Sequence, residues 1–564
     1  MADKPTESVP SVSEIPASAM TGRQGQLKKV LSLQDLYFLS LGGIIGSGWL
    51  FGSLYAAENA GPSAFLSWII GGIFVLFIAL TWAELGGMLP GSGSLARVPQ
   101  YAHGYFAGFY FGWAYFVSAV TVPPVEAIAV VTYASFYAPS LTSHGVLTPL
   151  GYAVSIVLMV ALFLLNYFGI RIFGRFNTGI TWWKLIIPTI TVILLISYFY
   201  PPNFSNFGGF TPYGTSPIFA SVGTAGIVFS YLGFRQAIDY SGEAKNPSRD
   251  VPRATIYSVL TGIVIYTLLQ IGFVGAVRPA QSGLSPFSWA NLGNSLYSSG
   301  PLAEVFAILG LTIWTTILLI DAIISPMGTL GIYTGTSARV LFALSEGGHL
   351  PEKTGDVHQK YRIPWVALVL SLVIGIIFLF AFPAWGPLAT VVTSTTVFTY
   401  LAGATALQTF RRVAPELKRS YRLPAANVMA PLGFIMATLI VYWTGWPYTL
   451  YAFIAIILGL IAYAVARSRG NYKISDIKQG IWIVIYSIVM VILSYFGSYG
   501  PTSSAPYPGN FLASSVSAVI PFPYDFIPVI VVSIIFYIWG SHSGYETDEL
   551  KKIKELSTQA TPSS

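Results

Sequence analysis

Long apolar runs fill most of the chain, and short polar segments separate them. A helix needs about 20 apolar residues to cross the hydrocarbon core of a bilayer, and runs near this length recur along the chain. The pattern predicts an all-α polytopic membrane protein with about 14 transmembrane helices, at residues 36–60, 64–89, 106–136, 149–169, 179–200, 218–242, 254–276, 301–337, 364–382, 387–408, 428–445, 448–466, 481–497 and 522–539.

The placement of basic residues supports this prediction. If the first helix enters from the cytoplasm, all but three of the 29 Lys and Arg residues fall in cytoplasmic segments. Arg278 lies in an outside loop, and Lys184 and Arg235 lie within predicted helices. Cytoplasmic loops of membrane proteins carry such an excess of Lys and Arg. We therefore expect a multi-pass protein of the cell membrane with both termini in the cytoplasm.

Composition excludes several classes of function. Hydrophobic residues make up 54% of the 564 residues and charged residues only 9%, against about 25% charged in a soluble domain. This excludes a soluble enzyme, a nucleic-acid-binding protein and a disordered chain. There is no cysteine and there are only five histidines, and no nucleotide-binding or hydrolase motif occurs in a credible context. We expect no enzymatic activity, no cofactor, no metal and no nucleic-acid partner.

Glycine clusters interrupt the first and sixth predicted helices, at residues 42–48 and 223–233. Such clusters either permit close helix packing or mark a break in the helix. Interrupted helices at matching positions of two five-helix halves are a feature of inverted-repeat transporters. A half-helix N-terminus attracts an anion, and freed carbonyls hold a cation. An α-amino acid carries both groups.

Motifs around these clusters resemble those of the amino acid–polyamine–organocation (APC) permeases. The resemblance covers about residues 33–410 and rests on the stretches 46–48, 83–94, 124–127, 233–254 and 337–351. Three further stretches, at 45–51, 320–326 and 441–446, resemble the aspartate–proton symporter branch, which also has helices beyond twelve.

The resemblance implies a LeuT-type 5+5 inverted repeat with discontinuous helices 1 and 6, plus about four extra helices. It divides the chain into a disordered cytoplasmic tail, a transporter core with two repeats, a cytoplasmic loop, accessory helices and a second cytoplasmic tail. The first tail is residues 1–33, and the transporter core is residues 34–410, with repeats at about 34–200 and 218–410. The cytoplasmic loop is residues 411–427, the accessory helices are residues 428–540 and the second tail is residues 541–564.

The same resemblance implies a substrate site between helices 1 and 6, surrounded by helices 3, 8 and 10. The substrate carboxylate is expected on Gly46, Ser47 and Gly48, and the substrate ammonium on carbonyls around Ile44, Ile45, Phe229 and Ser230. Phe229 and Tyr231 are expected to cover the substrate. Gly233 is also among the expected substrate-binding residues.

Charges at bilayer depth cost about 2.5–3.5 kcal/mol even on lenient scales, so each one needs an explanation. The resemblance implies that Lys184 replaces the cation that sodium-coupled relatives hold between helices 1 and 8, which makes it a candidate for proton coupling. Alternatively, Lys184 extends to the cytoplasmic surface. Glu126 and Asp321 either relay protons or pair with Lys184 or Arg235.

Arg235 follows the second glycine cluster, where related permeases often carry an acid. Arginine stays protonated and binds carboxylates bidentately, so Arg235 suits the side chain of aspartate or glutamate. The alternatives are an internal ion pair with Glu126, Asp239 or Asp321, or a position in the cytoplasmic vestibule. An inner gate network is expected from the charged residues Asp239, Glu243, Lys245, Arg249 and Arg253.

These features predict a secondary active transporter that imports an acidic amino acid with protons, by alternating access. One alternative is a permease or exchanger for neutral or many amino acids, with Arg235 in a structural ion pair. Another is an amino acid receptor without transport. The expected partners are the amino acid, the proton and the bilayer, and the sequence leaves the oligomeric state open.

Overall fold

A computed structural model describes residues 29–91, 93–143, 145–168, 170–361, 363–467, 474–501 and 519–559. The predicted disordered tail therefore lies almost entirely outside the described residues, as do residues 560–564.

The helices of the first repeat are α2 (Leu33–Ile44), α3 (Gly48–Ala60), α4 (Ala64–Met88), α5 (Ser94–His103), α6 (Tyr105–Val120), α7 (Val122–Ala134), α8 (Pro149–Phe168) and α9 (Ile170–Ser197). A short hairpin of β1 (Thr142–Ser143) and β2 (Val146–Leu147) connects α7 to α8. The second repeat contains α10 (Ser216–Thr224), α11 (Ile227–Tyr231), α12 (Gln236–Asp239), α13 (Pro247–Ala276), α14 (Pro301–Ile308), α15 (Thr312–Glu346), α16 (Trp365–Ala381) and α17 (Trp385–Val413). The remaining helices are α18 (Ala426–Trp443), α19 (Tyr448–Arg467), α20 (Ile474–Phe496), α21 (Phe526–Ser543) and α22 (Asp548–Gln559).

The described helices match the predicted spans. Ten are long and apolar enough to cross a membrane, including one continuous stretch, Gly48–Met88, that joins α3 to α4. The sixth span is a pair of helices bent by 51°, and two shorter apolar helices supply the ninth and twelfth spans. With α2 and α3 as the two halves of the first span, each of the fourteen predicted spans has a counterpart. The expected all-α polytopic architecture of the LeuT type is confirmed.

Two boundaries differ from the prediction. The eighth span was expected as one helix over 301–337, but α14 ends at Ile308 and α15 runs from Thr312 to Glu346. The reason is Gly310, whose φ of 76° ends the helix inside a continuous apolar run. The tail from residue 541 is also partly ordered, since α22 packs on the core: Thr547 donates to the carbonyl of Tyr101, and Lys554 pairs with Glu416 at 2.7 Å.

The two broken spans cross at a pair of glycines. A side chain on Gly233 would overlap the backbone of Gly43 and Ile44. Only glycine at position 233 therefore lets the two spans approach this closely. Ser40 reinforces the crossing, because its hydroxyl donates to the carbonyl of Phe234 and accepts from the backbone N–H of Ala237. The inner halves of spans one and six are therefore tied together.

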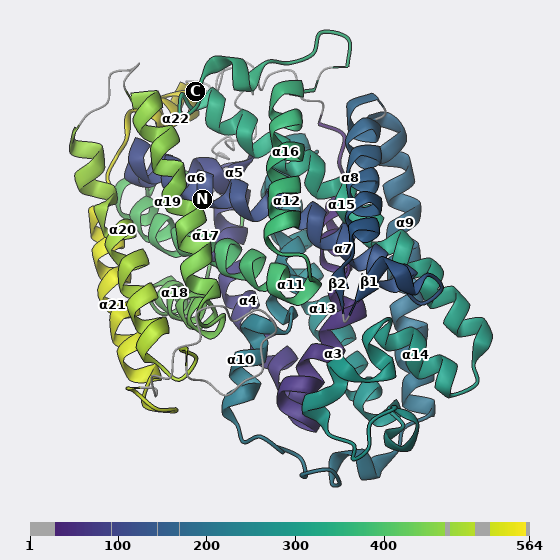
Figure 1. The fold of residues 1–564 in the computed structure, drawn as a ribbon. Helices are drawn as coiled ribbons and strands as arrows, with labels where there is room; N and C mark the ends of the chain where they lie inside the picture. The colour runs from purple at the N-terminus through teal and green to yellow at the C-terminus, as the bar shows by residue number, and fades with distance from the viewer. Residues whose placement is uncertain are drawn as a thin grey trace, which may run out of the picture.

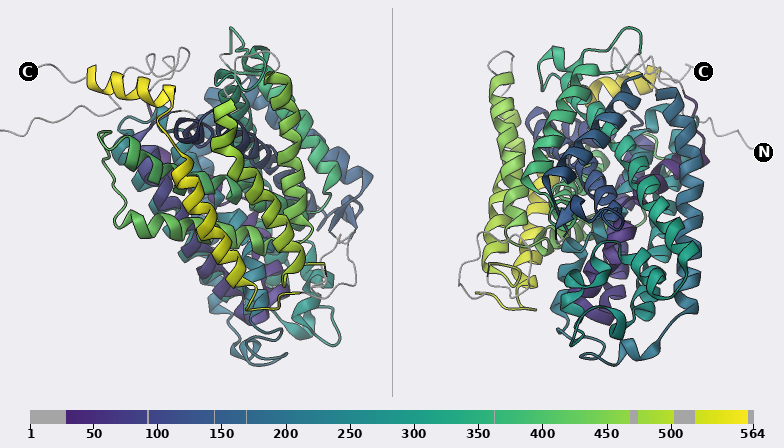
Figure 2. Two further views of the ribbon diagram at one scale, coloured as in Figure 1. Left: turned by 90° about the vertical axis from the view of Figure 1, so that its left-hand side faces the viewer. Right: turned by 45° about the vertical axis from the view of Figure 1, so that its right-hand side comes forward.

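The accessory helices lie on one side of the core, as the yellow-green elements of Figures 1 and 2 show. Helix α18 packs on α4 and α17, α19 and α20 pack on α6, and α21 packs on α18. Among the described residues, these helices meet broken span six at its outer edge, where Trp443 of α18 and Phe526 of α21 pack on Phe219 of α10. Large apolar side chains project outward from α9, α13, α16, α19 and α21, which is the arrangement expected of surfaces that face lipid.

Candidate substrate site

The first span unwinds between Ile44 and Gly48, and a carboxylate meets the exposed end of the second half. The backbone N–H of Ser47 donates to Glu126 Oε2 at 2.9 Å. Glu126 is fully buried on α7, and its Oε1 has no partner among the described residues. A side chain on Gly46 would lie 2.6 Å from that oxygen. Glu126 therefore occupies the N-terminus of α3, where the helix dipole favours an anion.

A cation occupies the other side of the same break. The ammonium of Lys184 donates to the carbonyl of Gly42 and to Thr329 Oγ1, both at 2.8 Å. Lys184 is only 1% exposed, so the alternative in which it extends to the membrane surface is wrong. The unwinding frees the Gly42 carbonyl, because the N–H of Gly46 bonds to Ile44 instead. Lys184 thus links spans one, five and eight.

The predicted ammonium-binding carbonyls are not equally free. The carbonyl of Ile44 accepts from the hydroxyl of Tyr266 at 2.8 Å and from the N–H of Gly46 at 3.0 Å. Ile45 and Phe229 are buried beside the break. Ser230 donates its hydroxyl back to the carbonyl of Gly226 at 2.7 Å. Of these groups, the Ile44 carbonyl is therefore the least suited to a ligand.

Aromatic rings cover one side of the break. The indole N–H of Trp385, at the start of α17, donates to Ser47 Oγ at 2.7 Å. Phe51 and Tyr55 stack on the Trp385 ring with centroids 5.1 and 5.5 Å away, and Phe229 meets it edge-on at 5.7 Å. Gly226 has a φ of 75° and lies against the indole, which leaves no room for a side chain. These rings close the break on the side of α3.

Tyr231 does not belong to this cover, contrary to the prediction. Its hydroxyl donates to the carbonyl of Trp68 at 3.1 Å, and its ring packs on Trp68 and Tyr266. Residues two apart on a helix point to nearly opposite faces. Phe229 therefore faces Trp385, whereas Tyr231 packs between α4 and α13. Gly233 likewise serves the crossing of the two spans.

Arg235 is completely buried and forms no direct ion pair with a described carboxylate, although Asp239 lies close enough to interact with it electrostatically. Its Nη1 donates to Ser118 Oγ at 3.0 Å, and the guanidinium lies over the rings of Tyr115 and Tyr333 at 4.8 and 5.1 Å. Its Nε and Nη2 form no hydrogen bond among the described residues, although the Tyr400 hydroxyl lies close to the guanidinium, and no described carboxylate lies within 4.0 Å. The expected internal ion pair is absent from this part of the chain. Asp239 accepts instead from the hydroxyl of Tyr115.

Asp321 interacts with Lys184 electrostatically but forms no direct ion pair with it among the described residues. Its Oδ1 accepts from the indole of Trp183 and from Ser325 Oγ, both at 2.7 Å, and its Oδ2 has no described partner. Asp321 precedes Thr329 by two helical turns on α15, or about 12 Å. A direct pair between Asp321 and the ammonium of Lys184 is therefore not formed.

Among the described residues, no side-chain bond joins the predicted inner gate residues to one another, but Arg339 interacts electrostatically with both Asp239 and Glu243. The carbonyl of Glu243 accepts from the N–H groups of residues 30 and 31, and the N–H of Lys245 donates to Leu31. Arg249 bonds to its neighbour Asp250 at 2.8 Å, and Arg253 is exposed. Backbone pairing of residues 30–31 with 243–245 closes this end of the sixth span. The side chain of Asp239 lies deeper, against Tyr115.

The sequence pointed to the correct helices around the break but missed several of their residues. Thr329 completes the lysine site, Trp385 forms the cover, and Ser118, Tyr115 and Tyr333 surround Arg235. These are common residue types without a local motif. Only their contacts with Lys184, Ser47 and Arg235 distinguish them.

Two broken helices that cross at their inner halves, with a carboxylate and an ammonium at the break, define a membrane transporter of the LeuT fold. The chain belongs to the amino acid permease family, whose profile matches residues 35–442. A glutamate/serine transporter, AimA, of Bacillus subtilis (strain 168) is 37% identical over 546 residues, which cover 95% of this chain and 97% of the relative. An aspartate-proton symporter of the same organism is 32% identical over 528 residues, 93% and 98% of the two chains.

A branched-chain amino acid permease, BcaP, of that organism is 24% identical over 479 residues, 81% of this chain and 97% of the relative. The resemblance to APC permeases and to the aspartate–proton symporter branch is thereby confirmed. The chain is an amino acid transporter of the membrane and not an enzyme.

Proposed function

We propose that this transporter imports an acidic amino acid, aspartate or glutamate, together with protons and by alternating access. It acts in the cell membrane with both termini in the cytoplasm. The observation that carries the proposal is Arg235, a fully buried guanidinium with two unpartnered nitrogens beside the broken sixth span. A buried unsatisfied donor costs about 1–3 kcal/mol. A substrate carboxylate that accepts from both nitrogens removes this cost.

In the proposed complex the substrate spans the break. Its α-carboxylate takes the N–H groups of Ser47 and Gly48, and that of Gly46 in exchange for the Ile44 carbonyl, and its ammonium takes carbonyls near Ile45 and Phe229. The side-chain carboxylate extends to Arg235. The relatives support this substrate class, because one is named as a glutamate/serine transporter and another as an aspartate-proton symporter. The first relative is also named for serine, a neutral amino acid. A transporter for both acidic and neutral amino acids is therefore the second candidate.

Uptake of radiolabelled aspartate into proteoliposomes tests the proposal. We expect accumulation that needs an inward proton gradient and no sodium, and that unlabelled glutamate inhibits but leucine and arginine do not. If only a neutral amino acid accumulates, the protein is still a transporter, but the proposed acidic substrate is rejected. Binding without accumulation would instead favour a receptor.

The geometry also supports a route for proton coupling. The carboxylate of Glu126 holds the N–H of Ser47, which is one of the groups proposed for the substrate α-carboxylate. Two carboxylates compete for one N–H and repel each other in a low-dielectric site. Protonation of Glu126 removes this repulsion, so substrate and proton bind together. On the other side of the break, the charge of Lys184 holds spans one and eight together.

Replacing Glu126 with Gln is expected to abolish the pH dependence of substrate binding. Gln still accepts from Ser47 but cannot ionise, so aspartate affinity at pH 8 should equal that at pH 5. Proton-driven accumulation should be lost while exchange persists. Binding titrations between pH 5 and pH 8 measure the effect. A pH dependence like that of the wild type would assign coupling to another group.

His349→Gln is the matched control. His349 lies outside the spans, and burial, with a smaller contribution from Arg97, lowers its pKa from 6.5 to about 3. It is therefore neutral throughout the pH range of the assay, and the variant should keep the wild-type pH profile. Because the folded pKa lies below the unfolded one, its contribution to stability is complete above pH 6.5 and declines as the pH falls toward 3.

A further inference from the structure

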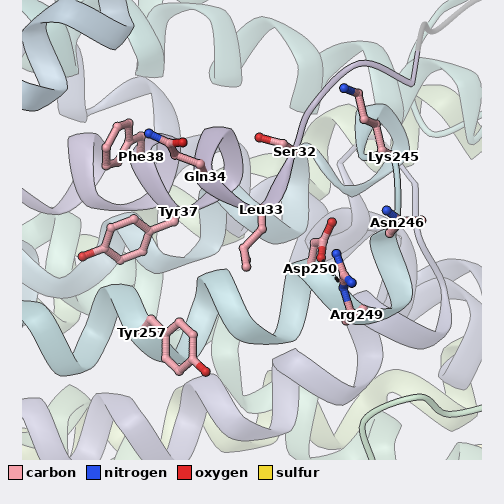
Figure 3. Close-up of a pocket in the computed structure, with 10 residues that line it drawn as sticks. All are labelled: Ser32, Leu33, Gln34, Tyr37, Phe38, Lys245, Asn246, Arg249, Asp250 and Tyr257. Carbon is pink, nitrogen blue, oxygen red and sulfur yellow. Dashed lines mark hydrogen bonds and ion pairs between the residues drawn. The ribbon is translucent and has the colours of Figure 1, made fainter.

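A groove with a volume of about 850 Å³ opens between the start of α2 and the start of α13. Figure 3 shows Lys245, Asn246 and Arg249 at one end and Phe38, Tyr37 and Tyr257 at the other. The basic end lies where α13 begins, just before the helix enters its apolar portion. The broken-helix region described above uses none of these side chains.

The exposed charges at this groove are all basic among the described residues. Lys245, Arg249 and Arg253 are exposed, and Lys29 is exposed nearby. The acids are less accessible: Asp250 is 1% exposed and bonded to Arg249, and Asp35 accepts from Ser32. Glu243 is half-buried, toward Arg339. The N-terminus of α13 adds a positive dipole end. The surface of this end therefore favours an anion.

The opposite end is aromatic and lies beside exposed rings of α13 and α9. Tyr257 is 52% exposed and lies two turns beyond Arg249 on α13, about 12 Å deeper along the helix. Phe38 packs edge-on against Trp182, which is 47% exposed. Tyrosine and tryptophan concentrate at the level of lipid headgroups. A basic end at the surface with an aromatic end beneath it matches a phosphate above a glycerol backbone and acyl chains.

We propose that this groove binds the headgroup of one anionic phospholipid, with its phosphate at Lys245 and Arg249. In the proposed orientation this lipid belongs to the cytoplasmic leaflet, where anionic lipids attract basic segments. The groove is built from both broken-span regions, because α2 is the inner half of span one and residues 243–245 follow span six. A bound lipid holds these two regions together at the paired segments 30–31 and 243–245.

Lipid binding to the purified full chain tests the inference by native mass spectrometry. The probes are dioctanoyl phosphatidylglycerol, dioctanoyl phosphatidylcholine and glycerol 3-phosphate. We expect one phosphatidylglycerol to bind at least tenfold more tightly than phosphatidylcholine, and the double variant K245Q/R249Q to lose this preference. Equal binding of the two lipids, or an unchanged double variant, would overturn the proposal. Binding of glycerol 3-phosphate as tight as that of phosphatidylglycerol would replace it with a soluble phosphate site.

Two further variants keep the test decisive. Arg249 also holds Asp250, so the double variant affects the start of α13. Lys245→Gln alone changes only an exposed side chain and should weaken phosphatidylglycerol binding three- to tenfold. The exposed pair Lys551 and Lys552 on α22 lies at the same end of the molecule, and K551Q/K552Q should bind like the wild type. If K551Q/K552Q loses as much phosphatidylglycerol binding as K245Q/R249Q, the attraction is an unspecific charge effect and the proposed site is wrong. Binding is read without transport, so failure here leaves the proposed function untouched.

Discussion

Replacing Lys184 with Met is expected to reduce proton-driven uptake about 100-fold. The ammonium is the donor that joins the freed carbonyl of Gly42 to Thr329, and so joins span one to span eight. Hydrogen bonds to charged groups contribute about 1.5–3 kcal/mol, and 1.4 kcal/mol corresponds to a factor of ten. Met fills the same volume but offers no donor. Initial rates in proteoliposomes measure the effect.

The conservative variant and a surface control sharpen this experiment. Lys184→Arg keeps the charge that joins the two spans, and Glu126 carries the proton in the proposed route, so this variant should retain substrate binding and most of the gradient-driven accumulation. Lys353→Met removes an exposed lysine of the loop after α15 and should transport normally. Normal accumulation by the Met variant at position 184 would show that the lysine only fills space between the spans.

Replacing Arg235 with Met is expected to weaken aspartate and glutamate binding about 100-fold and serine binding less than threefold. In the proposed complex, the two unpartnered nitrogens bind the side-chain carboxylate, which serine lacks. Removing one partner of a buried charge pair costs about 2–5 kcal/mol. The readout is the ratio of acidic to neutral affinities, measured by competition against one labelled substrate. A general loss of folding does not produce a selective change in this ratio.

Arg278→Met is the matched control, because it replaces another partly buried arginine with methionine away from the proposed site. Arg278 bonds to the carbonyls of Ala276 and Tyr198 and lies outside the broken-helix region. Its variant should leave the affinity ratio unchanged. If the Arg235 variant binds aspartate as tightly as the wild type does, the proposed acidic substrate is rejected. The broader amino acid specificity would then be the better explanation.

The sequence contained the spans and their breaks, because both depend on local composition. Each apolar run is long enough for a bilayer, and glycine at residues 42–48 and 223–233 weakens a helix wherever the helix lies. The lone charges Lys184, Glu126 and Arg235 were visible for the same reason: any charge in an apolar run is conspicuous. The end of α14 was missed because one glycine within a continuous apolar run does not reveal its φ.

Tertiary structure decided the partners of these charges. Ser47 and Glu126 are 79 residues apart, and Lys184 and Gly42 are 142 apart, so no local pattern relates them. Only packing shows that Arg235 lies between tyrosines without a direct ion pair and that Tyr231 faces away from Trp385. Helical periodicity places a residue on a face, but the neighbouring helix determines what that face meets. The sequence thus determined which residues are exceptional, and the fold determined what each of them binds.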